Sequence, residues 1–247
     1  MKDYTPPPDL LKNRIILVTG AGDGIGRVVA TTFAKHGATV ILLGKTTRKL
    51  EIVYDTIEKA GYPQPAIYPM NLEGASPKDY EDLAETLEKE FGHLDGLLHN
   101  AALLGSLTPL EHYDISLWYK LIQVNLNAPF QLTQACLGLM KQADSASIIF
   151  TSDSVGRKAK AYWGAYAVSK FAVEGMMQIL ADELETNTKI RVNSINPGPL
   201  RTNLRANAFP GENPANLPTP EIVMPLYLYL MGSESHAVNG QSINAQE

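Results

Sequence analysis

The chain has 247 residues, of which 45% are hydrophobic and 19% are charged, and its formal net charge at pH 7 is -5. This length and apolar content predict one domain over residues 1–247 with one substantial core. The acidic balance, the scattered Lys and Arg residues and the absence of a long apolar stretch exclude nucleic acid and membrane as partners, and we expect a cytoplasmic protein.

Short β-branched and aliphatic runs alternate with longer helical patterns along the chain, which is typical of βαβ units that build a parallel sheet. Several runs are apolar without alternation, as expected for strands that helices cover on both faces. The predicted fold class is therefore α/β, a single-domain Rossmann fold with a doubly wound, parallel, seven-stranded sheet and helices on both faces. The expected strands are Arg14–Val18, Thr39–Leu43, Ala66–Met70, Leu94–His99, Ala146–Phe150, Ile190–Ile195 and Gln241–Asn244.

The chain begins with an N-terminal arm, residues 1–12, in which Pro6-Pro7-Pro8 predicts an extended surface strap. Directly after the first strand comes Thr19-Gly20-Ala21-Gly22-Asp23-Gly24-Ile25-Gly26, and a helical pattern starts inside this segment. A strand, a tight glycine turn and a helix N-terminus place backbone N–H groups where a diphosphate can bind. We interpret this segment as a dinucleotide site, with an ordinary glycine-rich turn as the alternative.

The end of the second strand bears on which nicotinamide cofactor is used. Sites that prefer NAD carry an Asp or Glu there, whereas this chain has Gly44 followed by Lys45, with Arg48 close by. Lys45 can pair with a 2′-phosphate, so NADP(H) is preferred and NAD(H) remains possible. A solvated basic turn is the alternative reading of Lys45.

The next helices are predicted from apolar residues at helical spacing. Ser76-Pro77 and Asp79 are typical of a helix start. The single cysteine, Cys136, lies between helical apolar residues, so we interpret it as a buried small hydrophobe rather than a nucleophile, and we predict no metal site. The two apolar faces consist of Ile25, Val28, Val29 and Phe33, and of Tyr80, Leu83, Leu87 and Phe91.

Tyr166 and Lys170 lie one helical turn apart, so both side chains can share one site. A lysine cation at about 4 Å is worth roughly 4 kcal/mol at an effective dielectric of 20, which predicts a lowered pKa for Tyr166 and proton exchange near pH 7. An amphipathic helix with two chance polar residues is the alternative.

Further along, residues 203–220 are rich in Pro, Asn and Ala and too long for an ordinary connection, so we expect a mobile lid rather than a passive loop.

These motifs together resemble the short-chain dehydrogenase/reductase family. The resemblance lies in the TGxxxGxG spacing of Gly20, Gly24 and Gly26, and in the order of the motifs that follow. These are Asn100-Ala101-Ala102, Asn125, Tyr166 with Lys170, Pro197-Gly198 and Thr202. Within that family the chain is most similar to the YciK-like oxidoreductases of bacteria, through ILVTGAGDGIGR, VILLGK, WGAYAVSKFAVEGMMQ and MPLYLYLMG.

The resemblance implies a role for most of these residues. Tyr166 would protonate a carbonyl oxygen as hydride arrives from the cofactor, and Lys170 would also hold the cofactor ribose. Asn125 would kink its helix and hold a water in the proton relay, with a structural cap as the alternative. The implied cofactor contacts are Gly20, Gly22, Asp23, Gly24, Ile25, Gly26, Lys45, Asn71, Leu72, Asn100, Ala101, Ala102, Tyr166, Lys170, Pro197, Gly198 and Thr202.

The chain departs from the family where a catalytic serine is usual, thirteen residues before Tyr166, because Asp153 stands there. A carboxylate only accepts hydrogen bonds, would repel a developing oxyanion and would raise the pKa of Tyr166 again. Asp153 could be protonated and donate as serine does, or the enzyme could be impaired. It could also turn toward Arg157 or Lys158 while Ser152 or Ser154 replaces it, and we lean toward replacement by Ser154.

Other departures from the family are smaller. Ala102 stands for the usual glycine and adds a methyl group beside the cofactor ribose, which is expected to weaken binding. Asn71 stands for an adenine-binding Asp, and little loss is expected there. Asn239 and Asn244 stand where Thr and Asp commonly close the fold, and Asp23 stands where many NADP-dependent relatives carry a base. The residue at position 23 argues mildly against NADP(H).

Two functional hypotheses follow. The first is an NADP(H)-dependent carbonyl reductase or alcohol dehydrogenase for a small, largely apolar carbonyl or alcohol substrate. The second is a catalytically impaired dinucleotide-binding sensor or scaffold, favoured by Asp153 and opposed by the intact Tyr166, Lys170 and Asn125. We expect the substrate wall to include Trp163, Leu103, Leu104 and Phe209.

The resemblance also implies self-association as a homodimer or homotetramer. The family commonly pairs through the helix that carries tyrosine and lysine and through the helix before it. In this chain the apolar face of such an interface could come from Phe171, Met176, Met177 and Leu180, although these residues could equally pack inward.

Overall fold

The computed structural model describes residues 4–246, and these form one seven-stranded, all-parallel sheet in the order β3-β2-β1-β4-β5-β6-β7. All seven predicted strands are present, each within two residues of its expected bounds. They are β1 (Ile15–Thr19), β2 (Thr39–Gly44), β3 (Ala66–Pro69), β4 (Gly96–His99), β5 (Ala146–Thr151), β6 (Ile190–Asn196) and β7 (Ser242–Asn244).

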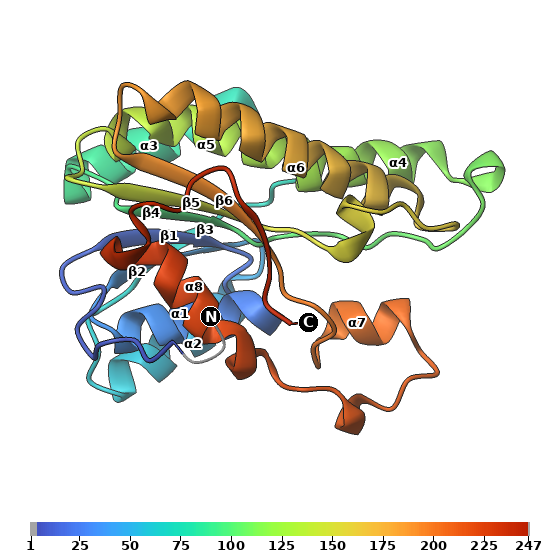
Figure 1. Cartoon of the computed structure of the whole chain (residues 1–247), viewed down its shortest axis with the longest axis horizontal. Coiled ribbons are helices and arrows are strands. Elements are labelled where there is room, and N and C mark those ends of the chain that lie inside the picture. Colours follow the sequence, from blue (N-terminus) through green and yellow to red (C-terminus); the bar gives the residue numbers. More distant parts are fainter. Residues whose placement is uncertain (1–3, 247) are drawn as a thin grey trace.

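Helices cover both faces of the sheet, so the predicted doubly wound α/β fold is confirmed (Figure 1). On one face lie α1 (Gly24–Lys35), α2 (Thr47–Lys59) and α8 (Met224–Met231). On the other lie α3 (Pro77–Phe91), α4 (Ile115–Ile122), α5 (Ala128–Met140) and α6 (Gly164–Glu185). Shorter segments are α7 (Asn203–Ala208), η1 (Leu110–His112), η2 (Gln123–Asn127), η3 (Ser154–Gly156), η4 (Pro214–Asn216), η5 (Pro220–Val223) and η6 (Ser233–Ser235).

The apolar strands divide their side chains between two cores, because successive residues of a strand point to opposite faces. In β1, Ile16 and Val18 join the core beneath α1 and α8, whereas Leu17 joins the core beneath α3, α5 and α6. Both faces are therefore buried, which explains why the strand sequences are apolar without alternation.

Helix α3 begins where the sequence predicts. The backbone N–H of Ser76 donates to Asp79 at 2.7 Å, Pro77 is the first helical residue, and Gly92 ends the helix with φ 75°. The predicted apolar face is buried at Tyr80 and Leu83. Local capping chemistry thus sets the ends of this helix.

The N-terminal arm differs from the predicted extended strap. Its residues 1–3 lie outside the described residues, residues 8–13 form turns, and Leu11 is fully buried in the core beside α1 and α8. The ring of Tyr4 packs edge-on against Tyr229 of α8 at 5.2 Å between centroids. The arm is therefore anchored by apolar burial, which the prolines obscured in the sequence.

Residues 203–220, expected to be irregular, instead begin with helix α7, whose N-cap is Thr202. The following loop is held by Arg201, whose guanidinium donates to the carbonyl oxygens of Pro214, Ala215 and Leu217. A six-residue helix is too short for its apolar periodicity to stand out, which is why the sequence pattern missed it.

The direction of strand order reverses between β1 and β4. The loops that leave the carboxyl ends of these strands separate there and open a crevice, the usual ligand site of such sheets.

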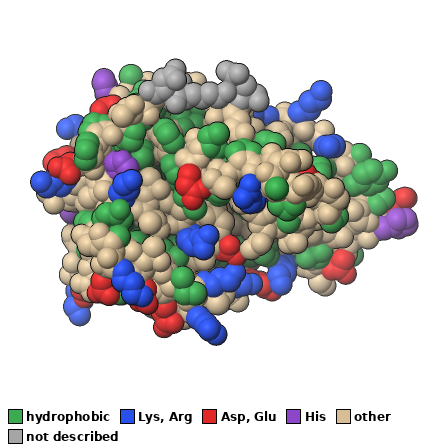
Figure 2. Space-filling model, turned by 90° about the horizontal axis from the view of Figure 1, so that it is seen from below, with side chains coloured by type: hydrophobic (Ala, Val, Ile, Leu, Met, Phe, Trp, Pro, Cys, Tyr) green, Lys and Arg blue, Asp and Glu red, His purple; other side chains and the backbone are tan. Residues whose placement is uncertain are grey.

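Figure 2 views the molecule from the side of α1, α2 and α8, where basic and acidic side chains are interspersed. Across residues 4–246, no helix combines the length and hydropathy needed to cross a bilayer.

Candidate active site

A cavity of about 720 Å³ lies at the carboxyl ends of the central strands. This volume is within the range of about 300 to 1,000 Å³ that ligand pockets occupy. All predicted cofactor residues except Gly26 line it, and so do the predicted catalytic residues Asp153, Ser154, Tyr166 and Lys170. Sequence motifs that are distant along the chain, from Gly20 to Thr202, therefore meet at one site.

The glycine turn has the backbone shape that a diphosphate site needs. Gly20 and Gly24 have φ of 66° and 50°, a region that side chains disfavour, and α1 begins at Gly24. A Cβ atom on Gly26 would collide with the carbonyl oxygen of Gly20. The missing side chain of Gly26 lets α1 pack against the turn. Gly26 itself does not line the cavity. The positive end of the α1 dipole suits an anion there, although Gly24 N already donates to Asp23.

Thr19 joins the ends of β1 and β4 beneath this turn. Its hydroxyl accepts from the backbone N–H groups of Asn100 and Ala101 at 2.9 and 3.0 Å and donates to the carbonyl of Leu98 at 3.2 Å. The Asn100 side chain donates to the Thr19 carbonyl at 3.3 Å. Sequence reasoning gave Thr19 no role, although its place directly before Gly20 was the available signal.

Asp23 connects three elements at the cavity rim. Its carboxylate accepts from Gly24 N at 2.7 Å, from Lys49 Nζ at 2.6 Å and from Asn203 Nδ2 at 3.2 Å. The Lys49 hydrogen bond is the main cause of a lowered pKa for Asp23. Asp23 and Lys49 are about half exposed, so this pair contributes little stability.

Two lysines, rather than Lys45 with Arg48, stand near the end of β2. Lys45 and Lys49 both line the cavity, whereas Arg48 is exposed on α2 and does not line it. Lys49, which sequence reasoning missed, thus stands at the cavity where Arg48 was expected, with its ammonium paired with Asp23. Arg48 and Lys49 lie in the same turn of α2, and the packing of that turn decides which side chain reaches the cavity.

Tyr166 and Lys170 project from α6 into the base of the cavity, where they are only 3% and 5% exposed. Lys170 Nζ donates to the carbonyl of Thr151 at 2.7 Å and lies 5.6 Å from the centroid of the Tyr166 ring. Burial lowers the pKa of Lys170 to about 8, and the charges of Asp153 and Glu174 oppose that shift. The two groups predicted to act together are thus in one site.

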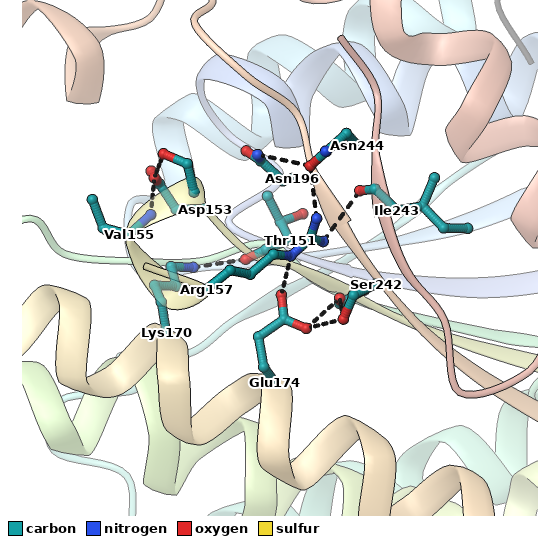
Figure 3. A network of polar contacts seen from close by, with 12 residues as sticks. Thr151, Asp153, Val155, Arg157, Lys170, Glu174, Asn196, Ser242, Ile243 and Asn244 are labelled. Atoms are coloured by element: carbon teal, nitrogen blue, oxygen red, sulfur yellow. Dashed lines mark hydrogen bonds and ion pairs between the residues drawn. The ribbon is translucent and has the colours of Figure 1, made fainter. Parts of the chain in front are cut away.

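Asp153 faces Tyr166. The Tyr166 hydroxyl donates to Asp153 Oδ2 at 3.1 Å, while Oδ1 accepts from Val155 N and Ser154 Oγ, each at 3.1 Å. Asp153 thereby caps η3 and does not turn toward Arg157 or Lys158. Arg157 pairs instead with Glu174 at 3.3 Å and with Asn244 at 2.6 Å (Figure 3).

The serines beside Asp153 also line the cavity, but Asp153 is the residue that hydrogen-bonds to Tyr166. Ser152 is buried and Ser154 is exposed at the cavity, with its hydroxyl donating to Asp153. Burial, followed by the charge and the hydrogen bond of Asp153, raises the pKa of Tyr166 well above its ordinary value. The expected lowering by Lys170 is therefore wrong in direction for this structure, because the carboxylate contacts the phenol directly and Lys170 is committed to Thr151.

Asn125 lies in η2, a π-helical turn between α4 and α5, as expected for a residue that kinks its helix. Its Oδ1 accepts from Leu103 N at 2.8 Å, and its Nδ2 donates to Leu103 O at 2.9 Å and Ser169 Oγ at 3.1 Å. Asn125 is buried and does not line the cavity. It acts on the site by holding the loop after β4 against α6.

Large apolar side chains line the cavity near Tyr166. All four predicted wall residues line it, and Trp163 lies 5.7 Å from Tyr166 and 5.9 Å from Phe209 between ring centroids. The Arg205 guanidinium stacks on Phe209 at 3.6 Å and is paired with Glu212 at 2.7 Å. The other two wall residues are Leu103 and Leu104.

The structure also shows where several other residues singled out in the sequence lie. Cys136 is buried, and burial raises the pKa of its thiol to about 12, so it is an inert core residue. Of the expected interface face, Met177 is fully buried and packs inward, whereas Phe171 is 42% exposed. Asn239 accepts from Val192 N at 2.9 Å and so ties the segment before β7 to β6. No three acidic, His or Cys side chains within residues 4–246 gather in a metal-binding group.

Comparisons with known proteins show the family of this chain. The family model for the short chain dehydrogenases matches residues 14–213. The uncharacterized oxidoreductase YciK of Escherichia coli (strain K12) is 50% identical over 243 residues, which are 98% of this chain and 96% of YciK.

Solved structures are equally similar. A short chain dehydrogenase from Pseudomonas syringae is 56% identical, with a TM-score of 0.97 and 99% of both chains covered. A short chain dehydrogenase from Escherichia coli CFT073, solved in complex with NADPH, is 50% identical, with a TM-score of 0.95 and coverage of 98% of this chain and 100% of that one. With its fold, its ordered motifs and these relatives in agreement, this chain belongs to the short chain dehydrogenase family of oxidoreductases.

Proposed function

We propose that this oxidoreductase uses NADP(H) to transfer hydride between the nicotinamide and the carbonyl or hydroxyl carbon of a small, largely apolar molecule. The observation that carries the proposal is the meeting of the Tyr166 and Lys170 side chains with the glycine turn in a single cavity. A bound nicotinamide supplies or accepts the hydride. The residues of the protein bind and orient the cofactor and the substrate, and they exchange the proton.

The cofactor assignment rests on charge and backbone shape. Gly20, Gly24 and the start of α1 can hold the diphosphate, and the end of β2 carries Lys45 without a carboxylate that would repel a 2′-phosphate. A relative that is 50% identical was solved with NADPH, which supports the same choice here. We place the adenine beside Asn71 and Leu72, and the ribose of the nicotinamide beside Asn100 and Lys170.

Tyr166 acts as the general acid in the reductive direction. Its raised pKa keeps the phenol protonated, so that a carbonyl oxygen within hydrogen-bond distance can take the proton. Lys170, with a pKa of about 8, is mostly a cation at pH 7 and offsets the phenolate that remains. Asp153 supports both protonated forms, but its carboxylate accepts the hydrogen bond of the Tyr166 hydroxyl and repels a developing oxyanion, so carbonyl reduction is slow.

The segment of residues 203–220 forms the substrate lid in this proposal, because α7 and Phe209 line the cavity opposite Tyr166. We also propose self-association as a homodimer or homotetramer through α5 and α6. Phe130 on α5 and Phe171 and Ile179 on α6 are large exposed apolar residues that suit such an interface.

The test combines binding with turnover. Fluorescence titration with NADPH and NADH measures cofactor preference, and equal affinities would remove the role of Lys45. The protein is then incubated with NADPH and a panel of aldehydes, ketones and quinones while the nicotinamide absorbance is followed. We expect slow turnover that Tyr166→Phe abolishes and Asp153→Ser raises about 10- to 100-fold, since a hydroxyl donor replaces a carboxylate.

A second candidate function is a catalytically impaired dinucleotide-binding sensor or scaffold. The hydrogen bond between the Tyr166 hydroxyl and Asp153 favours it, because the proton needed for carbonyl reduction is held by a carboxylate. Binding of NADPH without turnover of any compound, unrelieved by Asp153→Ser, would establish this alternative over the oxidoreductase reading.

A further inference from the structure

A carboxylate lies beside the Tyr166 hydroxyl, in the part of the cavity that the proposed hydride transfer assigns to the substrate's reacting bond. Asp153 Oδ2 is 3.1 Å from the Tyr166 hydroxyl, and Oδ1 is fixed by Val155 N and Ser154 Oγ. The backbone of Asp153 is extended, with φ -155° and ψ 159°, and directs the side chain from the end of β5 into the cavity. The orientation of this carboxylate is therefore set by its own cap and does not depend on a ligand.

No neighbouring cation neutralises this carboxylate at close range. Arg157 is committed to Glu174 and Asn244, and Lys170 donates to the Thr151 carbonyl (Figure 3). Within the described part of the chain, no Lys or Arg side chain forms an ion pair with Asp153. The site thus presents an acceptor carboxylate beside the phenol, and the Lys170 cation acts on it through space without an ion pair.

This charge favours one type of double bond over another. Reduction of C=O places negative charge on oxygen, which a facing carboxylate disfavours. A protonated C=N bond instead carries positive charge and an N–H donor, both of which match a carboxylate. The protonated form is also the form that accepts hydride readily, so stabilising it in the site raises the reactive fraction of the substrate.

The rest of the cavity is compatible with a cationic, otherwise apolar ring. Its wall next to Tyr166 consists of Trp163, Phe209 and two leucines, and aromatic faces attract cations. The nearby positive charge of Arg205 is paired with Glu212 at 2.7 and 2.9 Å, so it does not repel such a ligand.

We propose that this site reduces the C=N bond of small, apolar cyclic imines, with Asp153 binding the iminium N–H. This activity goes beyond carbonyl reduction but rests on the proposed hydride transfer. The imine takes its proton from solvent, and its N–H donates to Asp153. The carbon then gains a hydride from the reduced nicotinamide, which is oxidised by two electrons, while the C=N π pair becomes the nitrogen lone pair. The product is a neutral amine, and Tyr166 loses no proton.

The kinetic test compares a cyclic imine with a ketone of similar shape. The full-length protein is assayed with NADPH and either dihydroisoquinoline or tetralone, as wild type, Asp153→Asn, Asp153→Ser and Tyr166→Phe. Asn can still cap η3, so the fold is kept. We expect kcat/KM for the imine to exceed that for the ketone about 100-fold, and to fall about tenfold or more in both Asp153 variants. Tyr166→Phe should abolish ketone reduction while most imine reduction remains.

A binding measurement provides a readout that does not depend on turnover. Calorimetry with the protein saturated in NADP⁺ compares tetrahydroisoquinoline, a cation at pH 7, with the neutral alcohol tetralol. The wild type should bind the amine about tenfold more tightly, and Asp153→Asn should remove that preference. Asp182→Asn, at an exposed position of α6, is the matched control and should leave both affinities unchanged.

The outcomes separate the two proposals. Ketone reduction without imine reduction overturns the C=N assignment and leaves the carbonyl function standing. Equal imine reduction in wild type and Asp153→Asn overturns the role of Asp153. Turnover of neither compound, together with equal affinities for amine and alcohol, overturns both the C=N assignment and the oxidoreductase function.

Discussion

Glu174→Gln is predicted to destabilise the protein, because this carboxylate joins three elements behind the catalytic pair. Glu174 of α6 is 6% exposed and accepts from Ser194 Oγ of β6 at 2.7 Å, from Ser242 Oγ of β7 and from Arg157 Nε at 3.3 Å. Arg157 in turn donates to Asn244 Oδ1 at 2.6 Å, so the C-terminal strand is held against α6 (Figure 3).

The size of this destabilisation depends on which interactions of Glu174 the glutamine side chain keeps and which it loses. Removing one partner of a buried ion pair costs about 3 to 5 kcal/mol. Arg157 is partly exposed and retains Asn244 and the Ile243 carbonyl as acceptors, which lowers the cost. Glutamine also keeps one acceptor oxygen for the serines. We therefore expect a loss of about 2 to 3 kcal/mol in the free energy of unfolding at pH 7.

Urea unfolding at a series of pH values measures this loss and its origin. Burial alone would raise the pKa of Glu174, but the serine hydroxyls and Arg157 together outweigh burial and lower it. A lowered folded-state pKa contributes stability that is complete above the unfolded pKa of 4.5 and is lost as the pH falls through the folded value. The difference between wild type and Glu174→Gln should thus stay constant from pH 7 to about pH 5 and shrink below the unfolded value.

The matched control is Glu183→Gln, an exposed position on the same helix, which should change stability by no more than about 0.5 kcal/mol. If Glu174→Gln costs no more than this control, or if its cost grows as the pH falls, the network does not hold β7 in the way described.

Three further predictions concern single buried positions. Gly26→Ala should lower NADPH affinity about tenfold or more in a fluorescence titration, because the new Cβ meets the Gly20 carbonyl and displaces the turn; unchanged affinity would contradict the packing role. The Tyr80 hydroxyl is buried without a hydrogen-bond partner in the described chain. In thermal denaturation, Tyr80→Phe should therefore leave the free energy of unfolding unchanged or raise it by up to about 1 kcal/mol. A clear loss would reveal a missed hydrogen bond. Cys136, whose thiol pKa burial raises to about 12, should resist iodoacetamide at about pH 8 until the protein unfolds, as followed by mass spectrometry; rapid labelling of the native protein would show an open core.

Local patterns in the sequence were sufficient for the sheet, for several helices and for the glycine turn, whereas most other residues of the cavity followed from the resemblance to the family. Apolar runs without alternation imply strands covered on both faces, and the glycine turn follows β1 within a few residues, so short-range chemistry sets its shape. The pairing of Tyr166 with Lys170 depends only on helical periodicity.

The electrostatics of the site depended on contacts between distant segments, which no local pattern contains. Asp153 faces Tyr166 because the end of β5 meets the first turns of α6. Burial first and this contact second raise the pKa of the phenol, where proximity to Lys170 had predicted a decrease. Lys49 replaces Arg48 at the cavity because α2 packs beside the glycine turn. The sequence gives the type of each side chain, but tertiary packing determines which charged groups lie near it. Electrostatic interactions act through space between the groups that the fold brings together.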